Sequence, residues 1–384
     1  MNTSSTLTGE TAAPPPGLRV GEPAPWFVAR STANPRFTFH TAAGRYIVLG
    51  FVGSTQHPLA AAALAEIARR RALFDDVKAS FFGVSVDPTD EALGRVVDSL
   101  PGLRWFWDDD RAVSRLYGAV AAEAIAPENV TYRPFWLVLD PQLRCMLAAP
   151  LAETSAVLDF IAAAPAPADH AAAALHAPVL ILPRIFEPEF CRRLIATYEA
   201  AGGRTSGFMR DVDGKTRLIV DPAHKRRSDH DLIDPGLRAA AAARIRDRLI
   251  PEVAKAFQFT ATRMERYLVG CYDAAEGGHF RAHRDNTTAG TAHRRFAVTI
   301  NLNAEDYEGG DLSFPEFGPR RYRAPTGGAV VFSCSLLHMV DPITVGRRFA
   351  FLPFLYDEAA AKEREARNAE LGEGLTPYVA VRTE

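Results

Sequence analysis

The sequence is short of cysteine and has no long apolar run, and both absences exclude large classes of protein. Its 384 residues include only 4 cysteines, none in a CxxC pair, which argues against a disulfide framework or a structural zinc site. No stretch approaches the length that spans a bilayer, and the N-terminus lacks the basic start and apolar core of a secretory signal. We therefore expect a cytoplasmic protein with reduced thiols. The cysteines are Cys145, Cys191, Cys271 and Cys334.

The chain also lacks an excess of charge of either sign. Its formal net charge is −2 and its isoelectric point is near 6.6, so electrostatics gives no overall attraction to nucleic acid or to anionic lipid. We expect neither nucleic acid nor a membrane as a partner. A small-molecule or peptide substrate is the expected partner.

Composition shifts along the chain indicate two domains. Residues 1–17 are rich in Ser, Thr, Pro and Gly and are expected to be disordered, and the Ala/Pro-rich stretch 163–177 is typical of a linker. The linker separates a domain over 18–162 from one over 178–357. A charged tail over 358–384 follows the second domain.

The first half reads as an α/β domain with a central sheet. The run RYIVLGFVG predicts a strand buried on both faces, and a helix begins after it at Pro58. The runs ASFFGVSVD and PFWLVLD predict two further strands, and DEALGRVVDSL, over residues 90–100, predicts a helix between them.

This order, with FFGVSVD and RPFWLVLDPQLRCML, resembles the thioredoxin fold in its peroxiredoxin-like branch over residues 18–162. A peroxiredoxin needs a thiolate at the turn after the first long strand. This chain has GSTQHPLA there, with His57 before the helix and no cysteine. We interpret the domain as redox-silent and as serving packing, substrate presentation or formation of a homodimer; peroxide or thiol chemistry through Cys145 is the alternative.

The second half predicts helices followed by short antiparallel strands. Helices are expected after Glu187-Pro188 and after the capping pair Asp234-Pro235. The strand RFAVTINLN alternates, with Phe296, Val298, Ile300 and Leu302 on one face. This order favours an α+β domain built on a β-sandwich or jelly roll.

The stretch GHFRAHRDN contains the first pair of candidate metal ligands. His283 and Asp285 are two residues apart, so on a strand they point to the same face. His338, which follows the apolar run AVVFSC, is a candidate third ligand from the opposite side of a barrel. Two histidines and one carboxylate form the facial triad that suits non-haem Fe(II). An HxD pair alone recurs by chance, so the interpretation depends on its context.

The context includes a candidate carboxylate-binding arginine. Arg348 lies ten residues after His338, on a strand expected beside the one that carries this histidine. A buried guanidinium binds a carboxylate through two charge-assisted hydrogen bonds, as a dicarboxylate cosubstrate requires. Arg347 and Arg348 face opposite ways on a strand, so only one of them can reach the pocket.

At this point the sequence resembles the Fe(II)/2-oxoglutarate-dependent dioxygenases of the prolyl 4-hydroxylase-like group over residues 178–357. The matching segments are YLVGCYDAAEGGHFRAHRD, TINLNAEDYEGGDLSFPEFG and APTGGAVVFSCSLLHMVDPITVGRR. The resemblance implies a double-stranded β-helix (jelly roll) that uses Fe(II), 2-oxoglutarate and O2, with ascorbate as a candidate reductant. It implies His283, Asp285 and His338 as iron ligands and Arg348, or Arg347 if the register slips, as the residue that binds the 2-oxoglutarate C5 carboxylate.

Further pocket residues follow from the same resemblance. Tyr272 is the candidate tyrosine beside the C5 carboxylate, with Tyr267 as its competitor, and Thr299 is a candidate lesser contact. The charged stretch 221–234 is expected to be a solvated surface, with a substrate lid as the alternative. The implied function is hydroxylation of a C–H bond of a peptide, amino acid or small metabolite. The alternative is a non-catalytic scaffold or binding protein.

Overall fold

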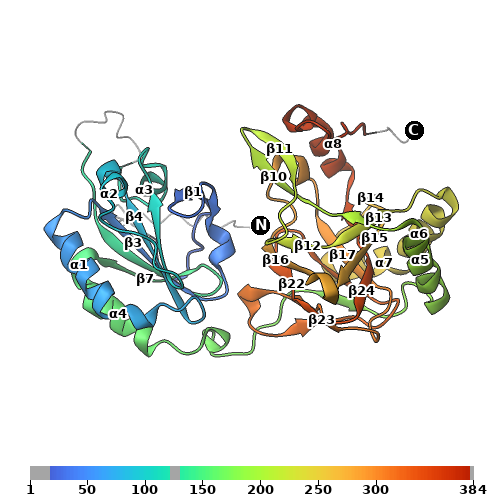
Figure 1. The fold of residues 1–384 in the computed structure, drawn as a ribbon, viewed down its shortest axis with the longest axis horizontal. Helices are drawn as coiled ribbons and strands as arrows, with labels where there is room; N and C mark the ends of the chain where they lie inside the picture. The colour runs from blue at the N-terminus through green and yellow to red at the C-terminus, as the bar shows by residue number, and fades with distance from the viewer. Residues whose placement is uncertain (1–17, 122–129, 381–384) are drawn as a thin grey trace, which may run out of the picture. The chain divides into compact units, whose positions relative to one another are not determined.

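The computed structural model describes residues 18–121 and 130–380. They form two compact units, one mainly of the chain up to Leu175 and the other of the chain from His176 onward (Figure 1). The division lies within the stretch 163–177 that has the composition of a linker. The expected disorder of residues 1–17 concerns a segment outside the described residues. No helix in the described part of the chain is long and apolar enough to cross a membrane.

A mixed seven-stranded sheet forms the centre of the N-terminal unit. Its strands, in order across the sheet, are β2 (Phe37–Thr38), β1 (Val28–Ser31), β5 (Leu103–Trp107), β4 (Ala79–Ser85), β3 (Tyr46–Gly53), β6 (Phe135–Leu139) and β7 (Cys145–Pro150). The neighbours β3 and β4 run parallel and are buried along their whole length, as their apolar runs predict. Helices α1 (Pro58–Arg69) and α4 (Thr154–Ala163) lie side by side and pack against this sheet (Figure 1).

The helix predicted over residues 90–100 is much shorter in the structure. Helix α2 spans only Pro88–Ala92, where the Asp87 carboxylate caps it by accepting from the Thr89 N–H at 2.9 Å. Gly94 follows with a φ of 59°, a left-handed conformation that ends an α-helix. The predicted helix over residues 90–100 is therefore wrong beyond its first residues, because the chain turns at this glycine.

The C-terminal unit contains two main antiparallel sheets. The larger has the order β14 (Arg263–Glu265), β25 (Phe354–Tyr356), β17 (Phe296–Asn301), β24 (Arg347–Phe351), β15 (Leu268–Asp273), β13 (Ser228–Asp231) and β9 (Arg204–Thr205). Two further strands extend this sheet: β21 (Ala329–Ser333) pairs with β17, and β8 (Leu180–Leu182) pairs with β21. The smaller has the order β12 (Lys225–Arg226), β16 (His279–His283), β22 (His338–Val340), β19 (Leu312–Ser313) and β20 (Arg321–Tyr322). Strands from both sheets line one cavity, as a jelly roll requires.

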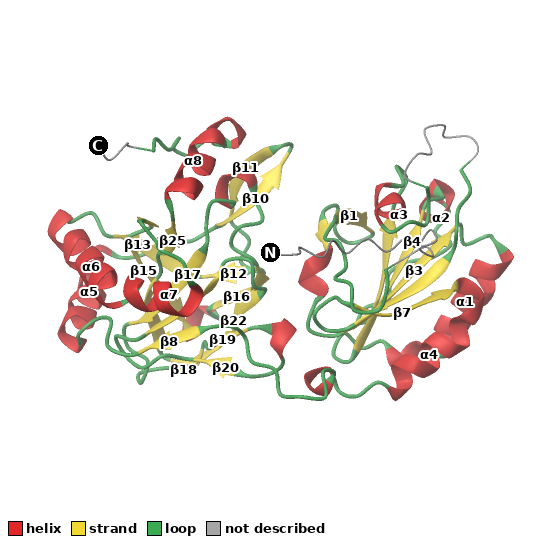
Figure 2. Ribbon diagram, turned by 180° about the vertical axis from the view of Figure 1, so that it is seen from behind, coloured by secondary structure: helices red, strands yellow, loops and turns green. Residues whose placement is uncertain are grey.

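Three helices cover one face of the larger sheet (Figure 2). They are α5 (Pro188–Ala201), α6 (Pro235–Arg248) and α7 (Ile250–Phe257). The predicted helix starts are confirmed, since Pro188 begins α5 and Asp234 caps α6 by accepting from the Leu237 N–H at 2.6 Å. On β17, Val298 and Ile300 pack into the core that these helices form with the sheet. Helix α8 (Glu358–Ala366) lies in the charged C-terminal region.

Candidate metal centre

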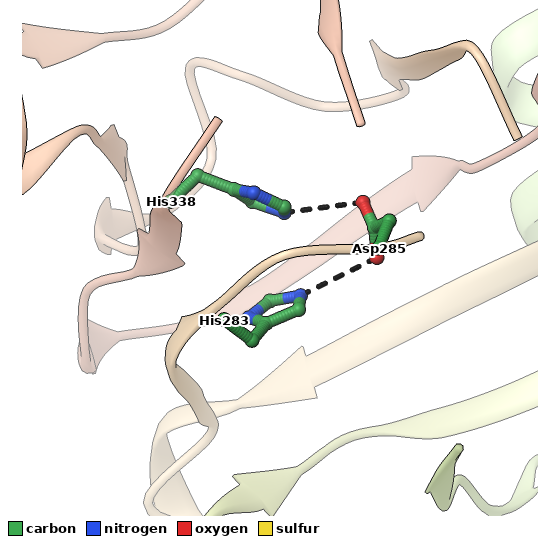
Figure 3. A group of neighbouring side chains, drawn as sticks. All are labelled: His283, Asp285 and His338. Atoms are coloured by element: carbon green, nitrogen blue, oxygen red, sulfur yellow. Dashed lines mark ion pairs between the residues drawn. The ribbon is translucent and has the colours of Figure 1, made fainter. Parts of the chain in front are cut away.

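Two histidines and an aspartate meet beside the smaller sheet (Figure 3). Strands β16 and β22 pair so that His283 and His338 are direct cross-strand partners, and Asp285 follows two residues after His283. One candidate ligand atom of each residue lies within 4.8 Å of the others. Asp285 Oδ1 is 3.5 Å from His283 Nε2, and Asp285 Oδ2 is 3.3 Å from His338 Nε2.

Backbone carbonyls determine which ring nitrogen of each histidine is free to bind an ion. His283 Nδ1 is 2.8 Å from the Arg281 carbonyl oxygen, and His338 Nδ1 is 3.0 Å from the Leu336 carbonyl oxygen. A carbonyl has no proton to donate, so each Nδ1 must carry the hydrogen. In the neutral rings, both Nε2 lone pairs then face the Asp285 carboxylate. Hydrogen bonds from the far ring nitrogen to a backbone carbonyl are typical of histidines that bind a metal ion.

Burial and neighbouring charges shift the pKa values of His283 and Asp285. Burial, followed by the charge of His338, lowers the pKa of His283 to about 4, so that the ring is neutral near pH 7. Burial opposes ionisation of Asp285, but His338 and His283 outweigh it and hold the pKa of the carboxyl well below its usual value. Two imidazoles and a carboxylate are the donor set that non-haem Fe(II) takes, so the residues present fit this ion.

Aromatic rings hold the two histidines in place. Phe280 stacks on His283 with ring centroids 3.5 Å apart, and Phe332 contacts His338 with centroids 4.6 Å apart. Both phenylalanines line the cavity beside the triad. The two candidate ligand histidines are therefore packed against apolar rings, which cover them on one side.

The triad opens into a cavity of about 510 Å³, counted to its open mouth. Residues of both sheets line it: Lys225, Arg227, Arg266, Tyr272, Phe280, His283, Asp285, Ala297, Val298, Thr299, Leu312, Phe332, His338, Val340, Arg348, Leu352, Pro353 and Phe354. The two candidate pocket residues Tyr272 and Thr299 are thus brought to the same cavity as the triad and Arg348.

Arg348 places a buried guanidinium in this cavity. The residue is 2% exposed, and its Nε and Nη1 have no hydrogen-bond partner within the described structure. Leaving such donors unpaired in a buried site is unfavourable, and a carboxylate that accepts from the guanidinium reduces the penalty. Arg348 therefore fits the distal carboxylate of 2-oxoglutarate on geometry as well as on charge.

The competing residues lie elsewhere. Arg347 is half exposed and its Nη2 pairs with Glu199 at 2.7 Å, away from the cavity. Tyr267 packs against the helical core, with the Arg238 guanidinium carbon 4.6 Å from its ring centroid. Tyr272, by contrast, is the cross-strand partner of Arg348, and its hydroxyl lies 3.4 Å from Arg227 Nη1.

Three further cationic side chains line the cavity, and none of them was predicted from the sequence as a site residue. Lys225 and Arg227 come from the charged stretch 221–234, which was expected to be a solvated surface. They are 4% and 7% exposed, whereas Arg226 between them is exposed. The available signal was the period-two alternation of a strand, which turns every second residue of a charge run inward. Arg266, which precedes β15, had no such signal.

The N-terminal unit has no thiol at its sheet-to-helix turn. The His57 side chain caps α1 there by accepting from the Leu59 N–H at 3.3 Å, and Pro58 is the first helical residue. Thr55 beside it donates to Asp90, a buried carboxylate that also accepts from Ser85. Burial raises the pKa of Cys145, the opposite of what a reactive cysteine needs. The geometry of this turn is that of a helix cap.

Comparison with known families matches each unit separately. Residues 267–356 match the 2OG-Fe(II) oxygenase superfamily, and residues 20–143 match the AhpC/TSA family. A PKHD-type hydroxylase of Pseudomonas fluorescens is 33% identical over 108 residues, which are 26% of this chain and 46% of that protein. One from Polaromonas sp. is 28% identical over 202 residues, which are 49% of this chain and 82% of that protein. The chain spans less than half the length of the first curated relatives that it matches.

Solved structures resemble the two units more distantly. A prolyl hydroxylase from Trichoplax adhaerens, in complex with a hypoxia inducible factor peptide fragment, aligns at 18% identity and a TM-score of 0.40 over 49% of this chain and 86% of that one. Peroxiredoxin Q of Xanthomonas campestris aligns at 18% identity and a TM-score of 0.29 over 36% of this chain and 90% of that one. By the family matches, the C-terminal unit carries a 2OG-Fe(II) oxygenase domain related to PKHD-type hydroxylases, and the N-terminal unit carries an AhpC/TSA domain of thioredoxin-like fold.

Proposed function

We propose that this protein is an Fe(II)/2-oxoglutarate-dependent hydroxylase. The observation that carries the proposal is the presence, in one cavity, of the His283–Asp285–His338 cluster and the buried, unpaired guanidinium of Arg348. A scaffold protein would have no use for a carboxylate-binding arginine beside a metal-ligand triad.

Each residue has a definite task in this proposal. His283, Asp285 and His338 hold the iron through Nε2, a carboxylate oxygen and Nε2. Arg348 binds the C5 carboxylate of 2-oxoglutarate, with the Tyr272 hydroxyl beside it and Thr299 on the neighbouring strand β17. When bound, iron, 2-oxoglutarate and O2 supply the oxidation of an unactivated C–H bond, with release of succinate and CO2. The aromatic walls exclude water from the reaction.

Hydroxylation is the outcome that the ligand set favours. Asp285 occupies the coordination position that a halide would need, which disfavours halogenation. Ascorbate is proposed as the reductant that returns oxidised iron to the ferrous state. If so, omitting ascorbate should shorten the period of linear succinate release without changing its initial rate.

The decisive experiment is an anaerobic titration of the full chain with Fe(II) and 2-oxoglutarate. We expect the weak visible charge-transfer band of the chelate in the wild type, and no band in His283→Ala. Release of succinate from 2-oxoglutarate should follow when O2 is admitted. Failure of the folded wild type to bind either iron or 2-oxoglutarate would overturn the proposal and favour the scaffold alternative.

For the N-terminal unit we propose a role in binding, either of the substrate or of a second copy of the chain. The support is the helix cap at His57, where a peroxidase would carry its thiolate, together with the buried Cys145. Sedimentation of the full chain tests the homodimer. Hydroxylation of the same substrate by residues 178–384 alone, with unchanged kinetics, would contradict substrate presentation.

A further inference from the structure

The cavity beside the triad has more positive charge than the proposed cofactors neutralise. Its lining includes four cationic side chains, those of Lys225, Arg227, Arg266 and Arg348, and only one acidic side chain, Asp285. Clustering of like charges in a partly buried cavity is unfavourable unless anions bind there. A further anion can bind only where one of the four cations has no anionic partner.

Two of these cations are accounted for. Arg227 forms a two-point ion pair with Asp229, with Nε to Oδ1 at 2.6 Å and Nη2 to Oδ2 at 2.7 Å. Arg348 is assigned to the C5 carboxylate of 2-oxoglutarate. The other carboxylate of the cosubstrate and Asp285 balance the two charges of Fe(II). Lys225 and Arg266 are left over.

Lys225 lies on the metal side of the cavity without a counter-ion. Its Nζ donates to Ser206 Oγ at 2.7 Å and to the Gly207 carbonyl at 2.6 Å, and it lies 4.8 Å from the centroid of the Phe280 ring. Phe280 in turn stacks on His283. Within residues 18–121 and 130–380, no carboxylate forms an ion pair with Lys225. Its amino group is thus held by neutral groups next to the candidate metal ligands, and burial, followed by the charge of Arg227, lowers its pKa well below the usual value.

Arg266 reaches the cavity from a strained backbone position. Its φ is 64°, a left-handed conformation that costs about 1 kcal/mol or more in a residue with a side chain. Its guanidinium carbon lies 5.2 Å from the centroid of Phe354, and no ion pair joins it to a carboxylate of the described residues. Burial, followed by the charge of Arg294, lowers the pKa of Arg266 to about 10. The chain therefore maintains an unpaired cation here at an energetic cost.

We propose that Lys225 and Arg266 bind an acidic group of the substrate, so that the enzyme acts on a small molecule that carries a carboxylate or phosphate. This inference rests on the proposed oxygenase function and adds the substrate class. A small molecule is favoured because Lys225 is only 4% exposed, inside a cavity of limited volume. The pair would hold the anion by charge-assisted hydrogen bonds and so fix which C–H bond faces the metal.

The test uses the full chain with Mn(II), which fills the metal site without turnover, and saturating 2-oxoglutarate. Inorganic phosphate is then titrated calorimetrically. We expect phosphate to bind the wild type, and Lys225→Met and Arg266→Met each to weaken binding by at least about tenfold, the loss of one charge-assisted contact. Arg266→Lys, which keeps the charge, should recover most of the affinity. Arg226→Met, which removes the exposed neighbour on β12, is the matched control and should bind as the wild type does.

The outcomes separate this inference from the proposed function. If both Met variants still bind 2-oxoglutarate, the cofactor site is intact. If the wild type itself does not bind 2-oxoglutarate, the proposed oxygenase function is refuted. Equal phosphate affinity in all variants, no phosphate binding at all, or displacement of 2-oxoglutarate by phosphate would each overturn the second anion site. If Lys225→Met does not fold, the phosphate affinities of Arg266→Met and Arg266→Lys decide whether the second anion site exists. Tighter binding of a capped triglutamate peptide than of free glutamate would show that the substrate is an acidic polypeptide and not a small molecule.

Discussion

Tyr272 and Arg348 lie directly opposite each other on the antiparallel strands β15 and β24, and the Arg348 guanidinium carbon is 5.3 Å from the centre of the tyrosine ring. The ring and the buried surroundings thus hold the guanidinium over the cavity. The fork geometry of arginine is therefore available to a bound carboxylate in a preorganised orientation.

We predict that Arg348→Met weakens binding of 2-oxoglutarate to the Mn(II)-loaded protein. Loss of one partner of a buried charge pair costs about 2 kcal/mol or more, which corresponds to at least about thirtyfold in affinity. Arg348→Lys should recover only part of it, since a lysine cannot bind a carboxylate in two-point fashion. Arg347→Met is the control, and an equal loss in that variant would show that the wrong arginine was assigned. Isothermal titration calorimetry measures all four proteins.

Metal binding should stabilise the folded protein through Asp285. Asp285 lies 3.5 Å from His283 Nε2 and 3.3 Å from His338 Nε2, so one divalent ion can bind all three side chains. At about a hundredfold excess of Mn(II) over its Kd, the free energy of unfolding should rise by about 3 kcal/mol. Thermal unfolding should show this rise in the wild type and in Glu189→Ala, which alters an exposed carboxylate of α5. An undiminished rise in Asp285→Ala would remove Asp285 from the ligand set.

The ion pair between Arg227 and Asp229 should make part of the stability pH-dependent. Burial opposes ionisation of Asp229, but Arg227 outweighs it and lowers the pKa of the carboxyl to about 2. Because this folded-state pKa is below the unfolded value of about 3.9, the contribution is fully present above pH ~4 and is lost as the pH falls toward 2. Asp229→Asn should reduce the free energy of unfolding near pH 7 by roughly 2 kcal/mol, and the difference from wild type should shrink on acidification. Urea unfolding at several pH values measures it; a difference that is constant with pH would contradict the assignment.

The N-terminal turn should become thiol-reactive when a cysteine is placed at its helix cap. In His57→Cys the new thiol would lie at the N-terminus of α1, where the helix dipole lowers a thiol pKa. We expect it to react with iodoacetamide faster than any wild-type cysteine, since all four are buried. Peroxide consumption by the wild type and by Cys145→Ser should both stay at background. Peroxide consumption that depends on Cys145 would revive the thiol-chemistry alternative.

Local patterns were sufficient for much of the fold. The apolar runs of β3 and β4, the capping residues before α5 and α6, and the alternation along β17 depend on neighbours a few positions away, so they can be read from the chain. The metal ligands were also recognisable, since His283 and Asp285 are adjacent on one segment and His338 follows a strong apolar strand. The short α2 shows the limit, because the left-handed conformation of Gly94 ends a helix that was predicted to continue to residue 100.

The sequence by itself indicated the two fold classes and supplied the candidate residues of the metal site. Only the tertiary structure showed that Arg348 and Tyr272, and not Arg347 and Tyr267, line the cavity, because the register of strands distant in the chain is set by packing of the whole sheet. It also turned Lys225 and Arg227 inward, against the usual behaviour of a charge run. The physical reason is the same in each case: a strand puts alternate residues on opposite faces, and the face that is buried depends on what the rest of the chain packs against it.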